Sequence, residues 1–418
     1  METVALIKDI LAGNRIEVRE SRNEADAAGV YSCRITLAGG LEEGDFGTNG
    51  KGMTEEYSLA SGYAELMERL QNLILFGDYP EGLYHSGKIK YFTAPDEVML
   101  DAEASYKNAG KVLGKLMRLP EDFKVPEGGT LSPSVPYKNI FTDEEVLLPH
   151  KTLRMVIGSN GMAAGNNYKE AVIQGLCEIY ERAAVREAYE FNRPIPRLHP
   201  ESFSGNEIYA RLEKLQEAGY KYSILDLSMG KSYPVIGLLL EKGGRKAFKA
   251  GADPCPVTAL ERCLTELFQG KRAETERLFH AECCAPFPEA GRSYKRWDIN
   301  DAEIAFNVDG TGLIAECLFD PSREYSEDYK CTEGESEEAD YDYMLALTKG
   351  LGYDLFVRDW SFLGFPSYQI IVPELSNYDL IYEDGAEIYE WSFDEIRFRE
   401  DVFTDGIAKI LNSFFGDR

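Results

Sequence analysis

Residues 175–185 read GLCEIYERAAV, and this stretch decides how the chain must fold. Its apolar residues recur every three or four positions, which predicts a helix with a buried face. Glu178, Glu181 and Arg182 lie within the same stretch. Because a charged side chain is costly to bury unless it is paired or bound to a ligand, the stretch predicts a helix that carries a functional polar face.

The same pattern of a glycine turn, an amphipathic helix and an acidic face occurs in two further places. The three stretches are NGKGMTEEYSLASGYAELMERL (49–70), NGMAAGNNYKEAVIQGLCEIYER (160–182) and AGADPCPVTALERCLTELFQGK (250–271). Their separations are long and irregular, which argues against a solenoid of short repeats. We interpret them as one supersecondary unit that is used three times.

Helical periodicity assigns the polar residues of each stretch to one face. These residues are Ser58, Ser61, Glu65, Glu68 and Asn72, then Glu170, Gln174, Glu178 and Glu181, and finally Arg262, Glu266 and Gln269. The polar face of a single amphipathic helix usually meets water. Three faces with the same acid spacing favour a shared site instead. The small residues beside the acids, Ser61, Gly62, Ala163, Ala164 and Gly165, predict close approach of a ligand.

Convergence of the three faces would gather several carboxylates around one cleft. Unpaired, they would repel one another and raise each other's pKa. Mg²⁺ accepts oxygen ligands and can bridge to phosphate oxygens, so it would remove this penalty. Arg69, Arg182 and Arg262 could contact the phosphates or hold the carboxylates in place. The pattern therefore predicts a magnesium–nucleotide site built from helices.

Composition and motifs exclude several other classes of protein. The formal charge of −27 disfavours nucleic acid and anionic membranes as partners. The segment GTNGKGMT (47–54) lacks the spacing of a P-loop, and no G-x-G-x-x-G fingerprint occurs. The four histidines are scattered and form no zinc motif. Eight cysteines without a C-x-x-C pair, together with the absence of a signal-peptide pattern, predict free thiols and a cytoplasmic location.

The three stretches, in this order, resemble the motifs of the YcaO superfamily. The matching segments are Ser61 to Arg69, Ser159 to Asn166 with Glu178 to Arg182, Gly251 to Pro254 with Arg262 to Gln269, and the late GFPSYQIIVPEL at 364–375. The resemblance spans roughly residues 45–375 and is greatest to the stand-alone bacterial YcaO proteins.

The resemblance implies an α+β fold of the YcaO type, in which mixed or antiparallel sheets back helices that carry an unusual site for ATP and Mg²⁺. It also implies the activity: phosphorylation of a peptide amide oxygen, followed by attack of a side chain to give an azoline or of external sulfide to give a thioamide. The implied Mg²⁺ ligands are Glu65, Glu68, Glu178, Glu181 and Glu266. The implied ATP contacts are Ser61, Arg69, Asn166, Glu170, Arg182, Arg262 and Gln269.

By the same resemblance, we expect a peptide or protein substrate, a partner protein that supplies sulfur or substrate, and a homodimer. A second function stays open, namely a nucleotide-binding accessory protein that assists another modifying enzyme such as a ribosomal-protein methylthiotransferase. Two departures bear on this choice. Asp253 stands where the family motif has histidine, and the chain has no Pro-x-Pro tail after Pro373. The missing tail argues against a standard azoline synthase.

We expect a single composite domain over residues 1–418. Its core motifs occupy about 45–375, an insertion rich in Pro and Gly occupies about 77–150, and an acidic, exposed and mobile connection occupies about 323–343. The helical C-terminal extension of longer relatives is expected to be absent. Predicted strands are 30–37, 221–228, 233–240, 302–308, 354–360 and 367–372. Predicted helices are 54–75, 167–190, 205–218 and 256–271.

Overall fold

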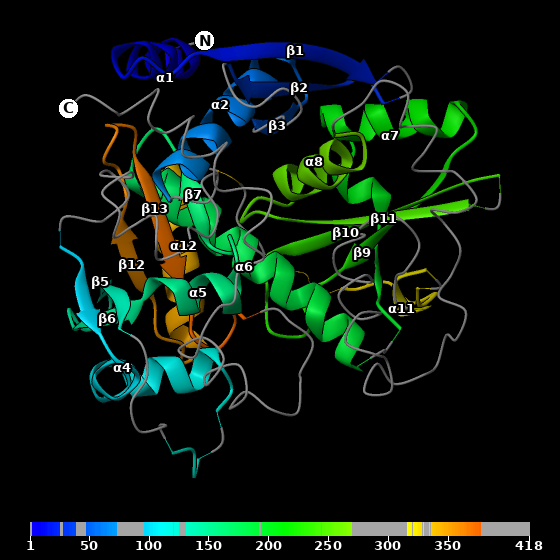
Figure 1. Cartoon of the computed structure of the whole chain (residues 1–418). Helices are drawn as coiled ribbons and strands as arrows, with labels where there is room; N and C mark the ends of the chain where they lie inside the picture. The colour runs from blue at the N-terminus through cyan, green and yellow to red at the C-terminus, as the bar shows by residue number, and fades with distance from the viewer. Residues whose placement is uncertain are drawn as a thin grey trace.

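The computed structural model of the 418-residue chain shows three antiparallel sheets with helices packed between and around them (Figure 1). The residues that it describes are 2–25, 28–38, 47–72, 96–119, 121–124, 131–191, 194–243, 245–269, 316–319, 321–327, 329, 334 and 336–377. The predicted α+β class is confirmed, and neighbouring strands of each sheet pair antiparallel.

The first sheet has three strands in the order β1-β2-β3. Its elements are α1 (Glu2–Gly13), β1 (Val18–Ala25), β2 (Val30–Leu37), β3 (Gly47–Gly52) and α2 (Glu55–Gln71). Helix α2 packs on β2 and β3, and α1 packs on α2. Thr54 caps the N-terminus of α2, and its side chain accepts a hydrogen bond from the backbone N–H of Tyr57 at 3.2 Å.

The second sheet has four strands in the order β11-β10-β9-β8. Its elements are β8 (Arg197–Leu198), the 3-10 helix η1 (Pro200–Phe203), α7 (Glu207–Glu217), β9 (Lys221–Asp226), β10 (Val235–Lys242), β11 (Arg245–Ala252) and α8 (Pro256–Leu267). Strand β10 is buried on both faces. Val235 and Leu239 belong to the same hydrophobic cluster as α6, whereas Ile236 and Leu238 pack with α8.

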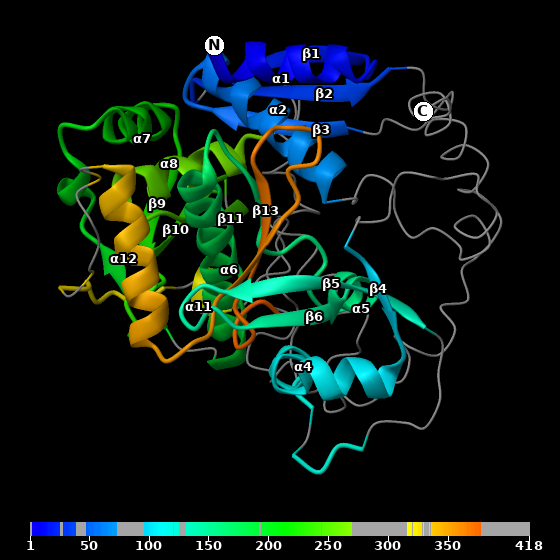
Figure 2. The ribbon, with the colours of Figure 1, turned by 90° about the vertical axis from the view of Figure 1, so that its left-hand side faces the viewer.

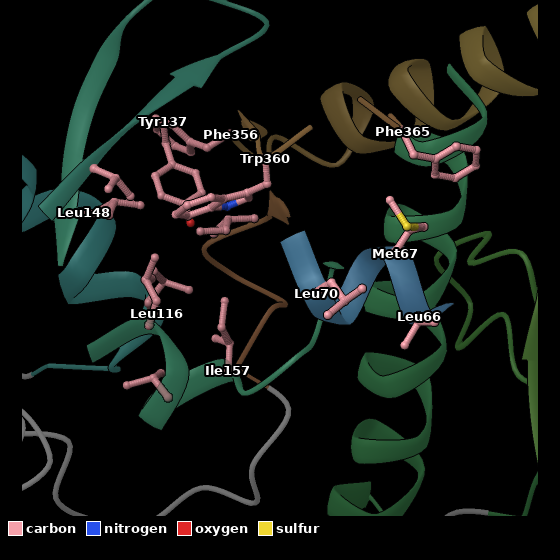
Figure 3. Close-up of a cluster of buried hydrophobic side chains, with 14 of the residues drawn as sticks. Leu66, Met67, Leu70, Leu116, Tyr137, Leu148, Ile157, Phe356, Trp360 and Phe365 are labelled. Atoms are coloured by element: carbon pink, nitrogen blue, oxygen red, sulfur yellow. The ribbon is translucent and has the colours of Figure 1, made fainter. Parts of the chain in front are cut away.

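The third sheet follows the order β4-β5-β12-β13-β7, with β6 paired to β5. Its strands are β4 (Val98–Leu100), β5 (Ser132–Asn139), β6 (Glu145–Pro149), β7 (Met162–Ala164), β12 (Phe356–Asp359) and β13 (Ser367–Ile371). The helices beside it are α4 (Ala102–Leu116), α5 (His150–Ile157), α6 (Tyr168–Phe191) and α12 (Glu337–Gly350). The short α11 (Glu316–Phe319) contacts α6 and β11 of the second sheet. Tyr137, Phe356 and Trp360 of this sheet pack against Leu116 and Ile157 (Figure 3).

Helix α6 occupies the centre of the molecule, between the second and third sheets (Figure 2). It contacts β7 and β13 on one side and β10 and β11 on the other. The apolar stripe predicted for it is buried throughout, and its members are Val172, Leu176, Ile179, Tyr180 and Ala183. This central position explains why the polar residues of α6 cannot simply face water.

The three repeated stretches each contain a strand that runs into a helix, β3–α2, β7–α6 and β11–α8. Glycines in the strands of these units allow the strand and the helix to pack closely. A Cβ on Gly50 would lie 1.9 Å from the Ser58 carbonyl oxygen, and one on Gly251 would lie 2.4 Å from that of Ala259. The expectation that Gly62 and Ala163 admit a ligand is wrong. Gly62 lies against Cys33 on β2, and Ala163 is fully buried in the core.

Most of the predicted elements are present. The helices at 54–75, 167–190, 205–218 and 256–271 correspond to α2, α6, α7 and α8, and five predicted strands correspond to β2, β9, β10, β12 and β13. The sixth predicted strand, 302–308, lies outside the described residues. Two residues expected on the open polar face of α2 are instead buried, since Ser58 and Asn72 are both 0% exposed.

Two segments differ from their prediction. The described part of the expected insertion, from residue 96 to 150, supplies β4, β5 and β6 of the third sheet, so it is part of the main body. Residues 337–343 of the expected mobile connection form the first half of α12. Ser336 caps this helix by accepting a hydrogen bond from Ala339 N at 3.2 Å, and acids in the first turn favour the helix N-terminus.

Among the described helices, none is both long and apolar enough to cross a lipid bilayer. The longest, α6, carries several charged residues along its length.

Candidate functional site

Charged residues on the polar faces of α2 and α6 lie within electrostatic range of one another. Glu68 on α2 is affected by the charges of Arg69 and Glu65 on its own helix, and by those of Glu178 and Arg182 on α6. Burial is the largest influence on Glu68 and raises its pKa well above the ordinary value. Acids that are far apart in the sequence therefore share one half-buried region.

Arginines pair with these acids within each helix. Arg69 Nη2 lies 3.4 Å from Glu65 Oε1, and Arg69 Nε lies 3.6 Å from Glu68 Oε1. On α6, Arg182 Nη2 lies 2.5 Å from Glu178 Oε1. These side chains keep between 13% and 31% of their surface exposed, so a solute can reach them.

The third helix joins the site through the first sheet. Glu266 on α8 forms an ion pair with Lys51 on β3. Gln269 Nε2 donates a hydrogen bond to the backbone oxygen of Asn49, also on β3, at 2.7 Å. Burial lowers the pKa of Lys51 to about 8, against the opposing charges of nearby acids that include Glu181. The predicted residues of α8 thus lie beside those of α2 and α6.

Arg262 links α8 to α6. Its Nη1 donates to Gln174 Oε1 at 2.5 Å, and its Nη2 lies 3.0 Å from Asp253 Oδ2. Asp253 is 8% exposed, and burial raises its pKa although the Arg262 charge acts in the opposite direction. Asp253 Oδ1 also accepts a hydrogen bond from Cys255 N at 2.9 Å. The aspartate that replaces the histidine of the family motif therefore holds this guanidinium.

A separate set of contacts orders the loop before α6. Glu170 Oε2 accepts hydrogen bonds from the backbone N–H and the Nδ2 of Asn166, at 2.9 and 2.8 Å. Thr3 of α1 donates to Asn166 Oδ1 at 2.7 Å. Asn166 is exposed, so it can also contact a ligand. Ser61 lies half-buried on α2, one helical turn before Glu65.

The residue types present fit Mg²⁺ and a triphosphate. Within the described residues, no three His, Cys, Asp or Glu side chains form a group that could hold a metal ion. Glu65, Glu68, Glu178 and Glu266 are instead each neutralised by an arginine or a lysine. Carboxylates suit Mg²⁺ and guanidinium groups suit phosphate, and the burial that raises the pKa of Glu68 is offset when a divalent cation binds beside it.

Three residues that contact this region were not predicted as site residues. Lys51 lies in the NGKG segment of β3, Thr3 lies near the N-terminus, and Gln174 was assigned only to a polar face. The single lysine inside a glycine-rich segment was a usable signal for the first. Nothing in the sequence pattern connects Thr3 with Asn166.

The remaining candidate groups have structural roles. Cys177 on α6 is 1% exposed and packs in the core. His150 lies against Trp360 with ring centroids 5.4 Å apart, and burial lowers its pKa to about 3. It is therefore neutral at physiological pH and lies in a different part of the fold.

The fold and this region together define a class of protein: an antiparallel α+β protein in which acids and arginines of three helices form one charged, half-buried site. The comparisons with known proteins agree. A family model described as "YcaO cyclodehydratase, ATP- and Mg²⁺-binding" matches residues 49–376. The chain therefore belongs to the YcaO family, as its motifs predicted, and the family description names the two predicted cofactors.

Two curated relatives are similar over most of this chain. An uncharacterized protein of Haemophilus influenzae is 28% identical over 371 residues, which is 82% of this chain and 60% of the relative. The ribosomal protein S12 methylthiotransferase accessory factor YcaO of Escherichia coli is 27% identical over 347 residues, 79% of this chain and 57% of the relative. The chain thus spans about three fifths of the length of these relatives.

A solved structure supports the fold. YcaO from Methanopyrus kandleri, determined bound with AMPPCP and Mg²⁺, superposes with a TM-score of 0.56 at 19% sequence identity. The superposition covers 91% of this chain and 92% of that chain. The arrangement of the three sheets around α6 is therefore that of a YcaO fold.

Proposed function

We propose that this protein uses ATP and Mg²⁺ to activate a peptide backbone amide, leading to a thioamide or an azoline. The observation that supports it most is that the charges of Glu178 and Arg182 on α6 act on Glu68 of α2, because these residues come from separate family motifs. Phosphoryl transfer depends mainly on positioning and on charge neutralisation, which such a site can supply.

The roles of the residues follow from their chemistry. Glu65, Glu68, Glu178, Glu181 and Glu266 are the proposed Mg²⁺ ligands. The proposed ATP contacts are Ser61, Arg69, Asn166, Glu170, Arg182, Arg262 and Gln269. The bound ion would neutralise charge on the phosphates. Arg69 and Arg182, now paired with acids of their own helices, would then be available to phosphate oxygens.

In the proposed reaction the amide oxygen attacks the γ-phosphorus and ADP leaves. A nucleophile then adds to the amide carbon, and phosphate leaves with the former amide oxygen. A Cys, Ser or Thr side chain of the substrate gives an azoline, whereas external sulfide gives a thioamide.

Binding of the nucleotide is the first test. We expect the full chain to bind AMPPCP with Mg²⁺ in a calorimetric titration. Glu178→Gln and Arg182→Ala should each weaken binding by about tenfold to a hundredfold, because each removes a charged group from the site. Glu213→Gln on α7 is the matched control, since Glu213 is exposed on a helix outside the site. Unchanged binding in both site variants would contradict the proposal.

A second candidate function is supported by one relative. The Escherichia coli protein is named as an accessory factor of a ribosomal protein methylthiotransferase. An accessory role for this chain predicts nucleotide binding with slow hydrolysis and a stable protein partner. Steady release of phosphate that increases with an added peptide would favour the enzyme, whereas co-purification with a modifying enzyme would favour the accessory role.

We also propose a peptide or protein as the substrate, a homodimer as the working form, and a partner protein that delivers sulfur or substrate. The charge of −27 supports a role without nucleic acid or anionic membranes, because both would be repelled. Light scattering of the purified chain, with and without Mg²⁺ and AMPPCP, tests the dimer.

A further inference from the structure

Lys51 pairs with an acid of one site helix and lies within electrostatic range of acids on the other two. Its ammonium pairs with Glu266 on α8, and the two side chains are 26% and 25% exposed. Burial lowers the pKa of Lys51, and the charges of Glu181 on α6 and Glu65 on α2 act against this effect. Lys51 itself lies on β3, in the first sheet.

This contact differs from the other ion pairs of the site. Arg69 and Arg182 pair with acids one turn away on their own helices, so these pairs can form without the tertiary fold. Lys51 lies on β3 of the first sheet, whereas Glu266 lies on α8, which packs on the second sheet. The two side chains meet only because α8 packs against β3. The hydrogen bond from Gln269 to Asn49 lies beside them and joins the same two elements.

Charge explains why a lysine is useful here. Several carboxylates in a half-buried region repel one another unless a cation lies among them. A lysine has a flexible side chain, so its ammonium group can supply that charge and can also move away from the acids, unlike a backbone group. Glu266 cannot keep its ammonium partner and accept a divalent cation on the same oxygen without repulsion between the two cations.

We propose that Lys51 is the resident counter-ion of the acidic helix faces, holding Glu266 until Mg²⁺ binds and then releasing it. This inference depends on the proposed function, because it assumes that the site takes Mg²⁺. It goes further by naming the residue that competes with the ion. Lys51 is thus a positioning residue that keeps α8 docked on β3 in the absence of metal.

The test compares Lys51→Met with the unmodified full chain, using Mg²⁺ alone and no nucleotide. Without divalent cations, the variant should have a lower Tm, because Glu266 loses its counter-ion. Mg²⁺ should bind the variant about tenfold more tightly, equivalent to ~1.4 kcal/mol, because its competitor is gone. Mg²⁺ should accordingly raise the Tm of the variant more than that of the unmodified chain. Lys138→Met, which removes an exposed ion pair with Asp143 on the third sheet, is the control.

A second measurement needs no variant. Labelling of lysine amines, followed by mass spectrometry, should show that Mg²⁺ alone increases the modification of Lys51 several-fold and leaves Lys138 unchanged. Equal or weaker Mg²⁺ affinity in Lys51→Met, or labelling of Lys51 that does not respond to Mg²⁺, would overturn the inference. If either occurs while the unmodified chain binds Mg²⁺ with AMPPCP, only the role of Lys51 is wrong. If the unmodified chain binds neither, the proposed function is wrong as well.

Discussion

Asp253 replaces the histidine of the family motif, and its carboxylate binds Arg262. Its carboxylate holds Arg262 at 3.0 Å, and its other oxygen accepts the Cys255 N–H at 2.9 Å. Arg262 is held on its other side by Gln174. Because two acceptors fix the guanidinium, its direction is set before any ligand arrives, which lowers the entropic cost of binding.

Asp253→Asn should therefore weaken binding of AMPPCP with Mg²⁺ by about fivefold, the effect of losing roughly 1 kcal/mol from a charge-assisted hydrogen bond. Isothermal calorimetry on the full chain measures this change. Asp354→Asn, which removes an exposed ion pair with Lys115, serves as the comparison and should bind normally. Equal affinity in the two variants would show that Asp253 does not position Arg262.

Glu20 is a second residue whose environment makes a clear prediction. Burial would raise its pKa, but hydrogen bonds from Lys8, Tyr63 and Arg22 outweigh this and lower the pKa to about 2. These partners belong to α1, α2 and β1. A carboxylate with a lowered folded pKa stabilises the fold above its ordinary value of 4.5, and this stabilisation is lost as the pH falls from 4.5 towards 2.

Glu20→Gln should remove that part of the acid sensitivity. We expect the variant to be less stable at pH 7 by about 1 kcal/mol, a value that allows for solvent screening of a partly exposed group. Its stability should then fall less steeply than that of the unmodified chain between pH 5 and pH 3. Urea unfolding at each pH measures both quantities, and parallel curves would contradict the assignment.

Among the elements, the strand–helix units depend on glycine at the contact. A Cβ on Gly50 would lie 1.9 Å from the Ser58 carbonyl oxygen and 2.5 Å from the Gly62 nitrogen. Both obstacles are backbone atoms, which cannot rotate away as a side chain can. The strand β3 and the helix α2 must therefore separate to admit even one methyl group.

Gly50→Ala should lower the free energy of unfolding by about 3 kcal/mol or more, as overpacking against a rigid backbone does. Gly114→Ala is the control, because Gly114 lies in helix α4 and an added Cβ meets nothing within 4 Å. That substitution should stabilise the protein by about 0.5–1 kcal/mol through helix propensity. Chemical denaturation of both variants gives the comparison, and a Gly50→Ala protein of normal stability would disprove the close contact.

The elements differ in how well the sequence predicts them. The apolar spacing of α6 was sufficient, because each buried residue repeats at the helical period. Strand β3, with the sequence GTNGKG, has residues that disfavour strands, and pairing of Gly50 with Cys33 on β2 makes it a strand nonetheless. Helix α12 was missed because its acids suggested exposure, whereas acids in the first turn also favour a helix N-terminus.

For the molecule as a whole, we expect a ligand at the site to stabilise the packing of the elements that surround it. Ligand that binds only the folded form raises its stability, by about 2.7 kcal/mol at a hundred times the Kd. AMPPCP with Mg²⁺ should therefore slow hydrogen exchange most in β3–α2, β7–α6 and β11–α8, which surround the site. Helix α4 and strand β6 should change little, because α4 packs on β6 and both lie at the end of the third sheet away from α2 and α8 (Figure 2). Uniform protection along the chain would indicate general stabilisation without a site.

The candidate site was predictable to the level of helix faces. The motifs assigned acids to α2, α6 and α8, and the structure brings charged residues of those helices together. Their role as Mg²⁺ ligands stays a prediction. The partners of each acid were not predictable. Lys51 lies far from Glu266 in the sequence, and the contact of Thr3 with Asn166 joins the first helix to a loop that is distant along the chain.

The order of residues alone established the helix periods, the repeated acid spacing and the family, because these properties involve residues a few positions apart. Folding in three dimensions established which charges neutralise one another. Lys51 neutralises Glu266 only after β3 of the first sheet meets α8 of the second, and Asp253 holds Arg262 only after β11 turns into that helix. Electrostatic energy depends on distance in space, and the packing of the sheets around α6 sets those distances.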